Sequence, residues 1–139
     1  MAETARARSF VWQLLSADAT LLPLIGPRIF REVAPGDSAY PFVVIRLLSP
    51  GNDLLVVGGR RIWAHPLFLI EAITKGTSSA PLEPIANRID QLLHLASGTV
   101  SNGFVHSIER ERPADRVIDE SGQRFSALGG EYRVRVSQT

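Results

Sequence analysis

The 139-residue sequence contains no cysteine, and Lys75 is its only lysine among 15 basic residues. Without cysteine the chain can form neither a disulfide framework nor a metal or redox site that depends on thiolates. The basic residues are almost all arginine, which we attribute to GC-rich coding rather than to a function of the guanidinium group. The net charge is only +1, so there is no overall electrostatic attraction to nucleic acid or to an anionic membrane.

Long apolar runs are also missing. No stretch approaches the roughly 20 apolar residues that span a bilayer, and the first residues lack the apolar core of a signal peptide. The longest apolar stretches, residues 42–48 and 62–73, have the length of strands and are interrupted by polar residues or proline. We therefore expect a soluble, intracellular protein with no membrane association.

Motifs for nucleophilic, phosphate or metal chemistry are scarce as well. No Gly-x-Ser-x-Gly occurs. The sequence GGRR at residues 58–61 lacks the glycine spacing, the lysine and the following helix of a phosphate-binding loop. The histidines His65, His94 and His106 have no carboxylate at a recognised metal-ligand or acid–base spacing, so we interpret them as structural. The sequence predicts no enzyme activity, no metal and no cofactor.

Hydrophobic periodicity predicts two main helices, at residues 4–16 and 82–96. Asp18 is expected to cap a short turn between them, and Pro66 to occupy a bulge or an unpaired edge position. Alternating or continuous apolar patterns predict strands at residues 28–33, 42–48, 61–74, 103–110 and 125–136. This order predicts an α+β fold, with a mostly antiparallel sheet of four or five strands and both helices on one face, in a single domain over residues 1–139.

Two segments are candidates for contact with a partner. The first, which we call the apolar segment, is Leu54, Leu55, Val56 and Val57, followed by Arg60. Four large apolar residues between glycine- and proline-rich stretches should not face water. They either fold back on the core or bury against a partner, and we favour the partner.

The second segment, which we call the arm, spans residues 110–124 and begins with charges that alternate in sign from residue 109. Its candidate contact residues are Arg110, Arg112, Asp115 and Arg116. The arm is either a solvated hairpin or an intersubunit element that exchanges salt bridges. The two interpretations stand equal for a ring-forming protein, whereas a monomer favours the solvated hairpin.

Several motifs follow one another in a distinctive order: LLPLIG at residues 21–26, YPFVVI at 40–45, isoleucines and leucines at positions 85, 89, 92 and 93, and EYRVRV at 131–136. This order resembles the small tail completion, or tail terminator, proteins of long-tailed bacteriophages. Pro66 and the apolar segment depart from that family's pattern.

The resemblance implies a structural virion protein with no catalytic, cofactor or metal residues. Such proteins form a ring, expected here to be a hexamer, at the head-proximal end of the tail, where the ring stops tail-tube polymerisation and joins the tail to the head or neck. The implied partners are other copies of the chain, the tail-tube protein and a neck or connector protein. DNA would pass through the ring without sequence-specific binding, and the protein would occupy the host cytoplasm only during assembly. The alternatives are a neck or head–tail adaptor, another small tail protein, or a small α+β module that binds a ligand or nucleic acid.

Overall fold

The structure, a computed structural model, describes residues 2–51, 54–55 and 61–138 of the chain. Its helices are α1 (Ala2–Ser16), α2 (Leu22–Ile25), the 3-10 turn η1 (Ala80–Leu82) and α3 (Glu83–Leu93). Its strands are β1 (Ile29–Arg31), β2 (Phe42–Ser49), β3 (Leu54–Leu55), β4 (Arg61–Ala64), β5 (Leu67–Lys75), β6 (Gly98–Val100), β7 (Gly103–Glu120) and β8 (Gln123–Gln138).

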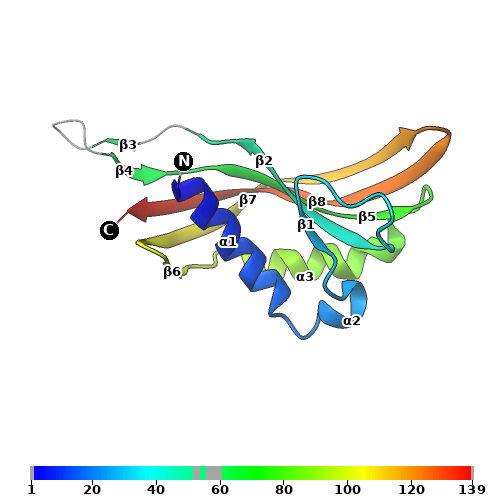
Figure 1. Ribbon diagram of the computed structural model, residues 1–139, viewed down its shortest axis with the longest axis horizontal. Coiled ribbons are helices and arrows are strands. Elements are labelled where there is room, and N and C mark those ends of the chain that lie inside the picture. Colours follow the sequence, from blue (N-terminus) through cyan, green and yellow to red (C-terminus); the bar gives the residue numbers. More distant parts are fainter. Residues whose placement is uncertain (1, 52–53, 56–60, 139) are drawn as a thin grey trace.

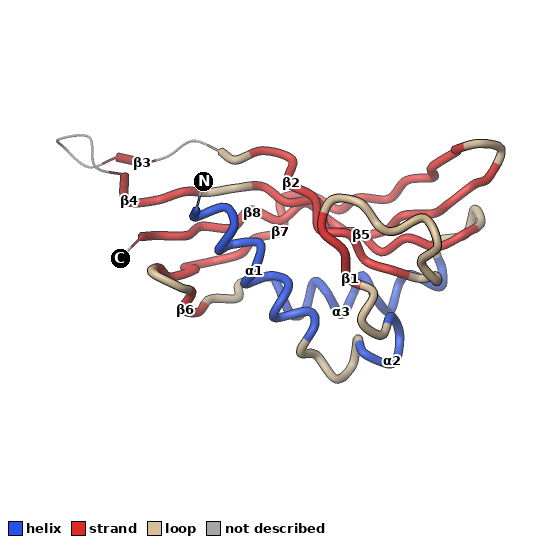
Figure 2. Tube along the Cα trace, viewed as in Figure 1, coloured by secondary structure: helices blue, strands red, loops and turns tan. Residues whose placement is uncertain are grey.

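All eight described strands belong to one curled sheet, and the helices lie on one side of it (Figure 1). The long strand β8 organises this sheet. It pairs with β7 along nearly its whole length, while its other side pairs first with β5 and then with β4. Beyond β5 the order continues to β2 and β1, and β1 runs parallel to β2. Figure 2 shows how far strands dominate the molecule.

The core lies between the helices and the covered face of the sheet. Along α3, apolar residues recur every three or four positions, which places Ile85, Ile89 and Leu93 on one buried stripe. Leu92, at the margin of that stripe, is only half-buried. The core residues from α1 and the central strands are Ala7, Phe10, Val11, Leu15, Val43, Ile45, Phe68, Ile70, Tyr132, Val134 and Val136.

The turn after α1 is held by Asp18. Its carboxylate accepts a hydrogen bond from the backbone N–H of Leu21 at 2.9 Å, which confirms the predicted cap. The same carboxylate accepts two hydrogen bonds from Arg88 on α3, at 2.7 and 3.0 Å. This pairing with Arg88 lowers the pKa of Asp18. One side chain therefore joins the end of α1 to α3.

The predicted fold class is wrong. The sheet has eight strands rather than four or five, and it is mixed because β1 is parallel to β2. The second main helix is shorter than predicted. The 15-residue α1 is the main helix, and α3 ends at Leu93 after 11 residues instead of continuing to residue 96. Strand therefore dominates the fold, which was expected to contain a smaller sheet of four or five strands and two main helices.

Two local causes account for most of this difference. Pro66 divides the strand predicted at residues 61–74, so that β4 and β5 pair with different parts of β8. The strand predicted at residues 103–110 continues through the charged arm, so that β7 has 18 residues, because its side chains find partners across β8. The short edge strand β6, which begins at Gly98, was not predicted from the sequence.

Candidate interaction surfaces

The end of the β7–β8 hairpin extends past the helices and contains the arm (Figure 1, orange). Its two-residue turn is formed by Ser121 and Gly122, whose φ angles of 52° and 77° are typical of a tight hairpin turn. Gly129 of β8 lies where the backbone of β5 comes very close. A Cβ atom at this position would lie 2.0 Å from the carbonyl oxygen of Ile70. Close strand packing at the base of the arm therefore requires glycine.

An ion pair with a buried carboxylate attaches the arm to the body. The Glu71 side chain lies on the sheet face away from the helices, and the residue is only 2% exposed. Its carboxylate accepts hydrogen bonds from Arg116 Nε at 3.2 Å and from Arg116 Nη2. This contact raises the pKa of Arg116. Because a buried carboxylate without a partner is strongly destabilising, the pair fixes the arm against β5.

Three further ion pairs cross between β7 and β8 at and below the base of the arm. They are more exposed than the pair at Glu71, and such pairs contribute about 0–1 kcal/mol each. A hydrogen bond from Arg133 lowers the pKa of Glu111. The distances are 3.4 Å for Arg112–Glu131, 3.0 Å for Arg133–Glu111 and 2.9 Å for Arg135–Glu109. Much of the alternating charge at the base of the arm is thus paired within the chain.

The candidate contact residues of the arm differ in their surroundings. Arg110, Arg112 and Arg116 all have acidic partners in their own chain; for Arg110 the partner is Asp90, at 3.6 Å. Asp115 is exposed, and the described part of the chain gives its carboxylate no ion-pair partner. The arginines therefore shape the arm, and Asp115 is the charge that it presents outward.

The described part of the apolar segment lies at the other end of the molecule from the arm. Leu54 and Leu55 form β3, which pairs with β4 and is far from the arm in Figure 1. Val56, Val57 and Arg60 lie outside the described residues. The structure thus places Leu54 and Leu55 away from the arm rather than in one site with it.

Sequence reasoning missed an aromatic cluster next to the arm. The ring of Tyr40 lies 5.3 Å from that of Phe42 and 5.9 Å from that of Phe125, measured between centroids. With Ile73 and Ile118 these rings line a cavity of about 200 Å³. Tyr40 and Phe42 share a strand-like spacing, but nothing in the sequence brings Phe125 to them.

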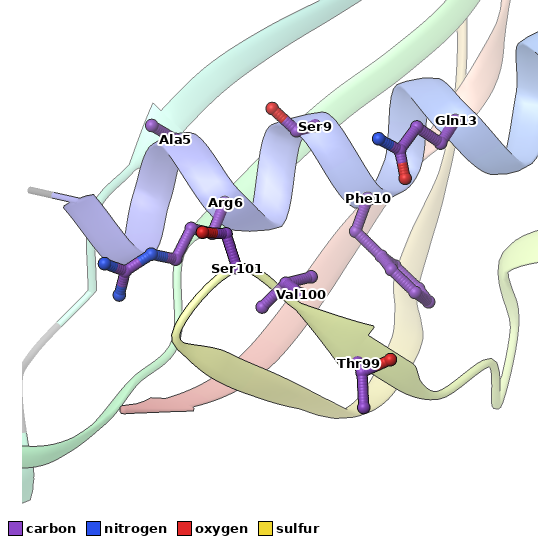
Figure 3. A pocket seen from close by; sticks show the side chains of 8 residues that line it. All are labelled: Ala5, Arg6, Ser9, Phe10, Gln13, Thr99, Val100 and Ser101. Atoms are coloured by element: carbon purple, nitrogen blue, oxygen red, sulfur yellow. The ribbon is translucent and has the colours of Figure 1, made fainter. Parts of the chain in front are cut away.

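Two grooves flank α1 and were also missed. The first lies between α1 and the β6 turn and has a volume of about 440 Å³. Figure 3 shows Arg6 and Phe10 reaching from α1 toward this turn, with Ser101 beside Arg6. The second, the α1–β1 groove, has a volume of about 200 Å³ and is lined by Ala5, Arg8, Ser9, Trp12, Arg31 and Ile45. Periodicity places Arg6 and Arg8 on the polar side of the helix, but it cannot show that strands border that side.

The histidines have ordinary structural contacts. The His106 ring lies 4.2 Å from that of Trp63, and its Nε2 is 2.7 Å from the Ser137 hydroxyl. His94 Nδ1 accepts a hydrogen bond from the backbone N–H of Arg110. Within residues 2–51, 54–55 and 61–138, no three histidine or acidic side chains are grouped to hold a metal ion. No helix in these ranges has the length and hydrophobicity to cross a membrane.

These features define a class of fold: one curled mixed sheet, helices on a single face and a long hairpin that extends past them. A chain described as "Virion of native gene transfer agent (GTA) particle" has this fold, with a TM-score of 0.74 and 24% sequence identity over 98% of each chain. Another solved chain, known by an identifier alone, matches with a TM-score of 0.56 and 10% identity over 98% of this chain and 92% of that one. No protein-family model and no curated protein matches the sequence.

Proposed function

We propose that the protein is a structural component of a phage-like particle. It would form a hexameric ring at the head-proximal end of the tail, end tail-tube polymerisation and join the tail to the head or neck. The observation that carries this proposal is the likeness, over 98% of both chains, to a chain from a gene transfer agent virion. The order of sequence motifs, which resembles tail terminator proteins, supports the same role.

The placement of the two contact segments suits this role. A head-to-tail ring needs two different surfaces on each subunit, and the arm and β3 lie at opposite ends of the molecule (Figure 1). The apolar segment would supply the stronger contact, because apolar burial contributes about 25 cal/mol per Å². Its residues are Leu54, Leu55, Val56 and Val57, with Arg60. The arm, with Arg110, Arg112, Asp115 and Arg116, would mainly set the register between subunits.

The proposed partners are the tail-tube protein on one side of the ring and a neck or connector protein on the other. DNA would pass through the ring without sequence-specific contacts. The protein would occupy the host cytoplasm only until it joins the particle.

Deletion of the gene tests this function. Particles made without the protein should have tails of irregular length and unattached heads, and the wild-type gene supplied in trans should restore them. Electron microscopy of wild-type particles should show a single ring of this chain at the junction. Tails of normal length that fail to attach would instead favour a neck or adaptor role, and normal infectious particles would contradict both.

The groove beside Arg6 favours a second candidate, a module that binds a small anion or a nucleotide. A guanidinium, hydroxyls and an amide line its 440 Å³, and this chemistry suits an oxyanion. Light scattering and calorimetry with phosphate and nucleotides distinguish the two functions. A monomer that binds one of these ligands and is missing from particles would support the binding module.

A further inference from the structure

We propose that Val117, between Asp115 and Asp119 at the end of the arm, docks into the α1–β1 groove of a second copy of this chain. The inference rests on the proposed ring-forming role, and it names the two surfaces that meet at one contact between subunits. One surface is an acidic strand face with an apolar centre. The other is a basic groove with an aromatic wall.

The strand face of the arm is formed by alternate residues of β7. Asp115, Val117 and Asp119 lie opposite Leu128, Ser126 and Arg124 of β8, so their side chains share the face on which the helices pack. All three residues are exposed, and the end of the hairpin extends past the helices (Figure 1). Val117 is 55% exposed, a high value for a large apolar residue in a strand.

Both carboxylates on this face are available to a partner. Asp115 is exposed and unpaired in the described part of the chain. Asp119 has a single loose ion pair, 3.7 Å from Arg124, and 65% of its side chain is exposed. The arm therefore presents one apolar side chain between two carboxylates.

The α1–β1 groove has the opposite character. Trp12, 48% exposed, forms its wall, and Ile45 lines it together with the arginines Arg8 and Arg31. Burial and the nearby charge of Arg31 lower the pKa of Arg8. Arg8 Nε is buried without a hydrogen-bond partner in the described residues, and the carboxylate of Glu32 reaches Arg8 only at 3.4 Å. The groove thus carries more positive charge than its own chain neutralises.

Docking would satisfy both surfaces. A carboxylate from the arm would pair with Arg31, which has no ion-pair partner in the described part of the chain, and would add to the single loose contact that Arg8 makes with Glu32. Val117 would cover the exposed indole of Trp12. Complementary charges at such a contact favour the correct partner and orientation. Because the two surfaces belong to different parts of the subunit, the contact is head-to-tail and can close a ring.

Charge reversal tests the pairing. Asp115→Arg and Arg31→Asp should each lower the amount of the protein in purified particles by about tenfold or more, since like charges meet at the contact. The double variant should restore incorporation to within about twofold, because the charges are again opposite. Asp115 and Arg31 are both exposed, so each single variant should fold, as circular dichroism of the purified chain will show. Glu83→Arg, an exposed reversal on α3, is the matched control and should be incorporated normally.

Engineered cysteines test the contact directly, because the natural chain has none. Val117→Cys combined with Ser9→Cys should give, in oxidised particles, a ladder of disulfide-linked multimers on a non-reducing gel. Val117→Cys combined with Leu95→Cys, which uses a side chain 70% exposed elsewhere, should remain monomeric.

Three results, each in particles that contain the protein, would overturn the inference while leaving the proposed function intact. The first is that Val117→Cys with Ser9→Cys gives no ladder, and the second is that the Leu95→Cys control gives an equally strong one. The third is that the double charge reversal does not restore incorporation. A disulfide from position 9 to a different virion protein would also overturn it by identifying another occupant of the groove. If the wild-type protein is missing from particles, the proposed function itself fails, and the inference falls with it.

Discussion

At the residue scale, the most consequential contact is the one between Glu71 and Arg116. The Glu71 side chain is 3% exposed, whereas 43% of the Arg116 side chain is exposed. The acid therefore depends on its partner far more than the base does. Nothing in the sequence joins these residues, because they are 45 positions apart and lie on different strands. The local charge pattern alone predicted Arg116 as an intersubunit contact, and that pattern does not reveal the buried Glu71 beside it.

Replacement of Arg116 should therefore destabilise the fold. Arg116→Met leaves a buried carboxylate without its cation, and we expect the free energy of unfolding to fall by about 2–3 kcal/mol, below the range for fully buried pairs because water can reach this site. The free energy of unfolding should fall less in the double variant Arg116→Met, Glu71→Gln than in the single variant, since no charge is left buried. Urea unfolding of the wild type and the variants measures both values. A single variant no less stable than the double variant would contradict this account.

Asp18 provides a prediction about pH. Its pKa is lowered below the ordinary value of 3.8, first by the hydrogen bonds from Arg88 and also by the N–H of Leu21. The ionised carboxylate thus stabilises the folded state above that value, and the stabilisation is lost as the pH falls through the lower folded-state pKa. Asp18→Asn should be less stable than the wild type at pH 7, and the difference should disappear toward pH 2. Urea unfolding across this range tests it, with the exposed Asp37→Asn as control; a pH-independent difference would contradict it.

At the scale of elements, the sequence was informative wherever the pattern was local. The turn at Ser121 and Gly122, the cap at Asp18 and the apolar stripe of α3 all follow from short-range rules, and the structure contains each of them. The strand count failed because it depends on long-range pairing. Charged residues extend β7 only because β8 offers partners along its length, and β6 exists only because β7 lies beside it.

The base of the arm gives a prediction at this scale. Gly129→Ala places a Cβ atom 2.0 Å from the Ile70 oxygen and 2.6 Å from Glu71 Cα, both backbone atoms that cannot move alone. We expect the free energy of unfolding to fall by about 1–3 kcal/mol, or more, because β5 and β8 must separate. Gly36→Ala is the matched control, since nothing lies within 4 Å of its added Cβ. Thermal unfolding compares the two, and equal midpoints would show that β5 and β8 tolerate separation here.

At the scale of the whole molecule, the sequence could identify segments but not the surfaces that receive them. The apolar segment and the arm were recognisable because each is unusual within a few residues. The α1–β1 groove was not, because it combines Trp12 from a helix with Arg31 from a strand edge. A head-to-tail assembly needs both a contact segment and a surface that receives it. The sequence alone therefore identifies the segment of each proposed contact but not the receiving surface.

The apolar segment gives the prediction that concerns assembly. Leu55→Ser with Val56→Ser removes apolar area that would contribute about 25 cal/mol per Å² when buried against a neighbour. If that area meets a partner, the variant should remain a folded monomer but should fail to join the tail, giving irregular tail lengths and unattached heads.

The matched control is Leu22→Ser with Leu95→Ser, which changes side chains that are 57% and 70% exposed elsewhere on the molecule. This control should assemble normally. Electron microscopy measures tail length, and circular dichroism confirms folding. Normal particles from the first variant would remove the apolar segment from the interface, whereas loss of folding would place these residues in the core of their own subunit.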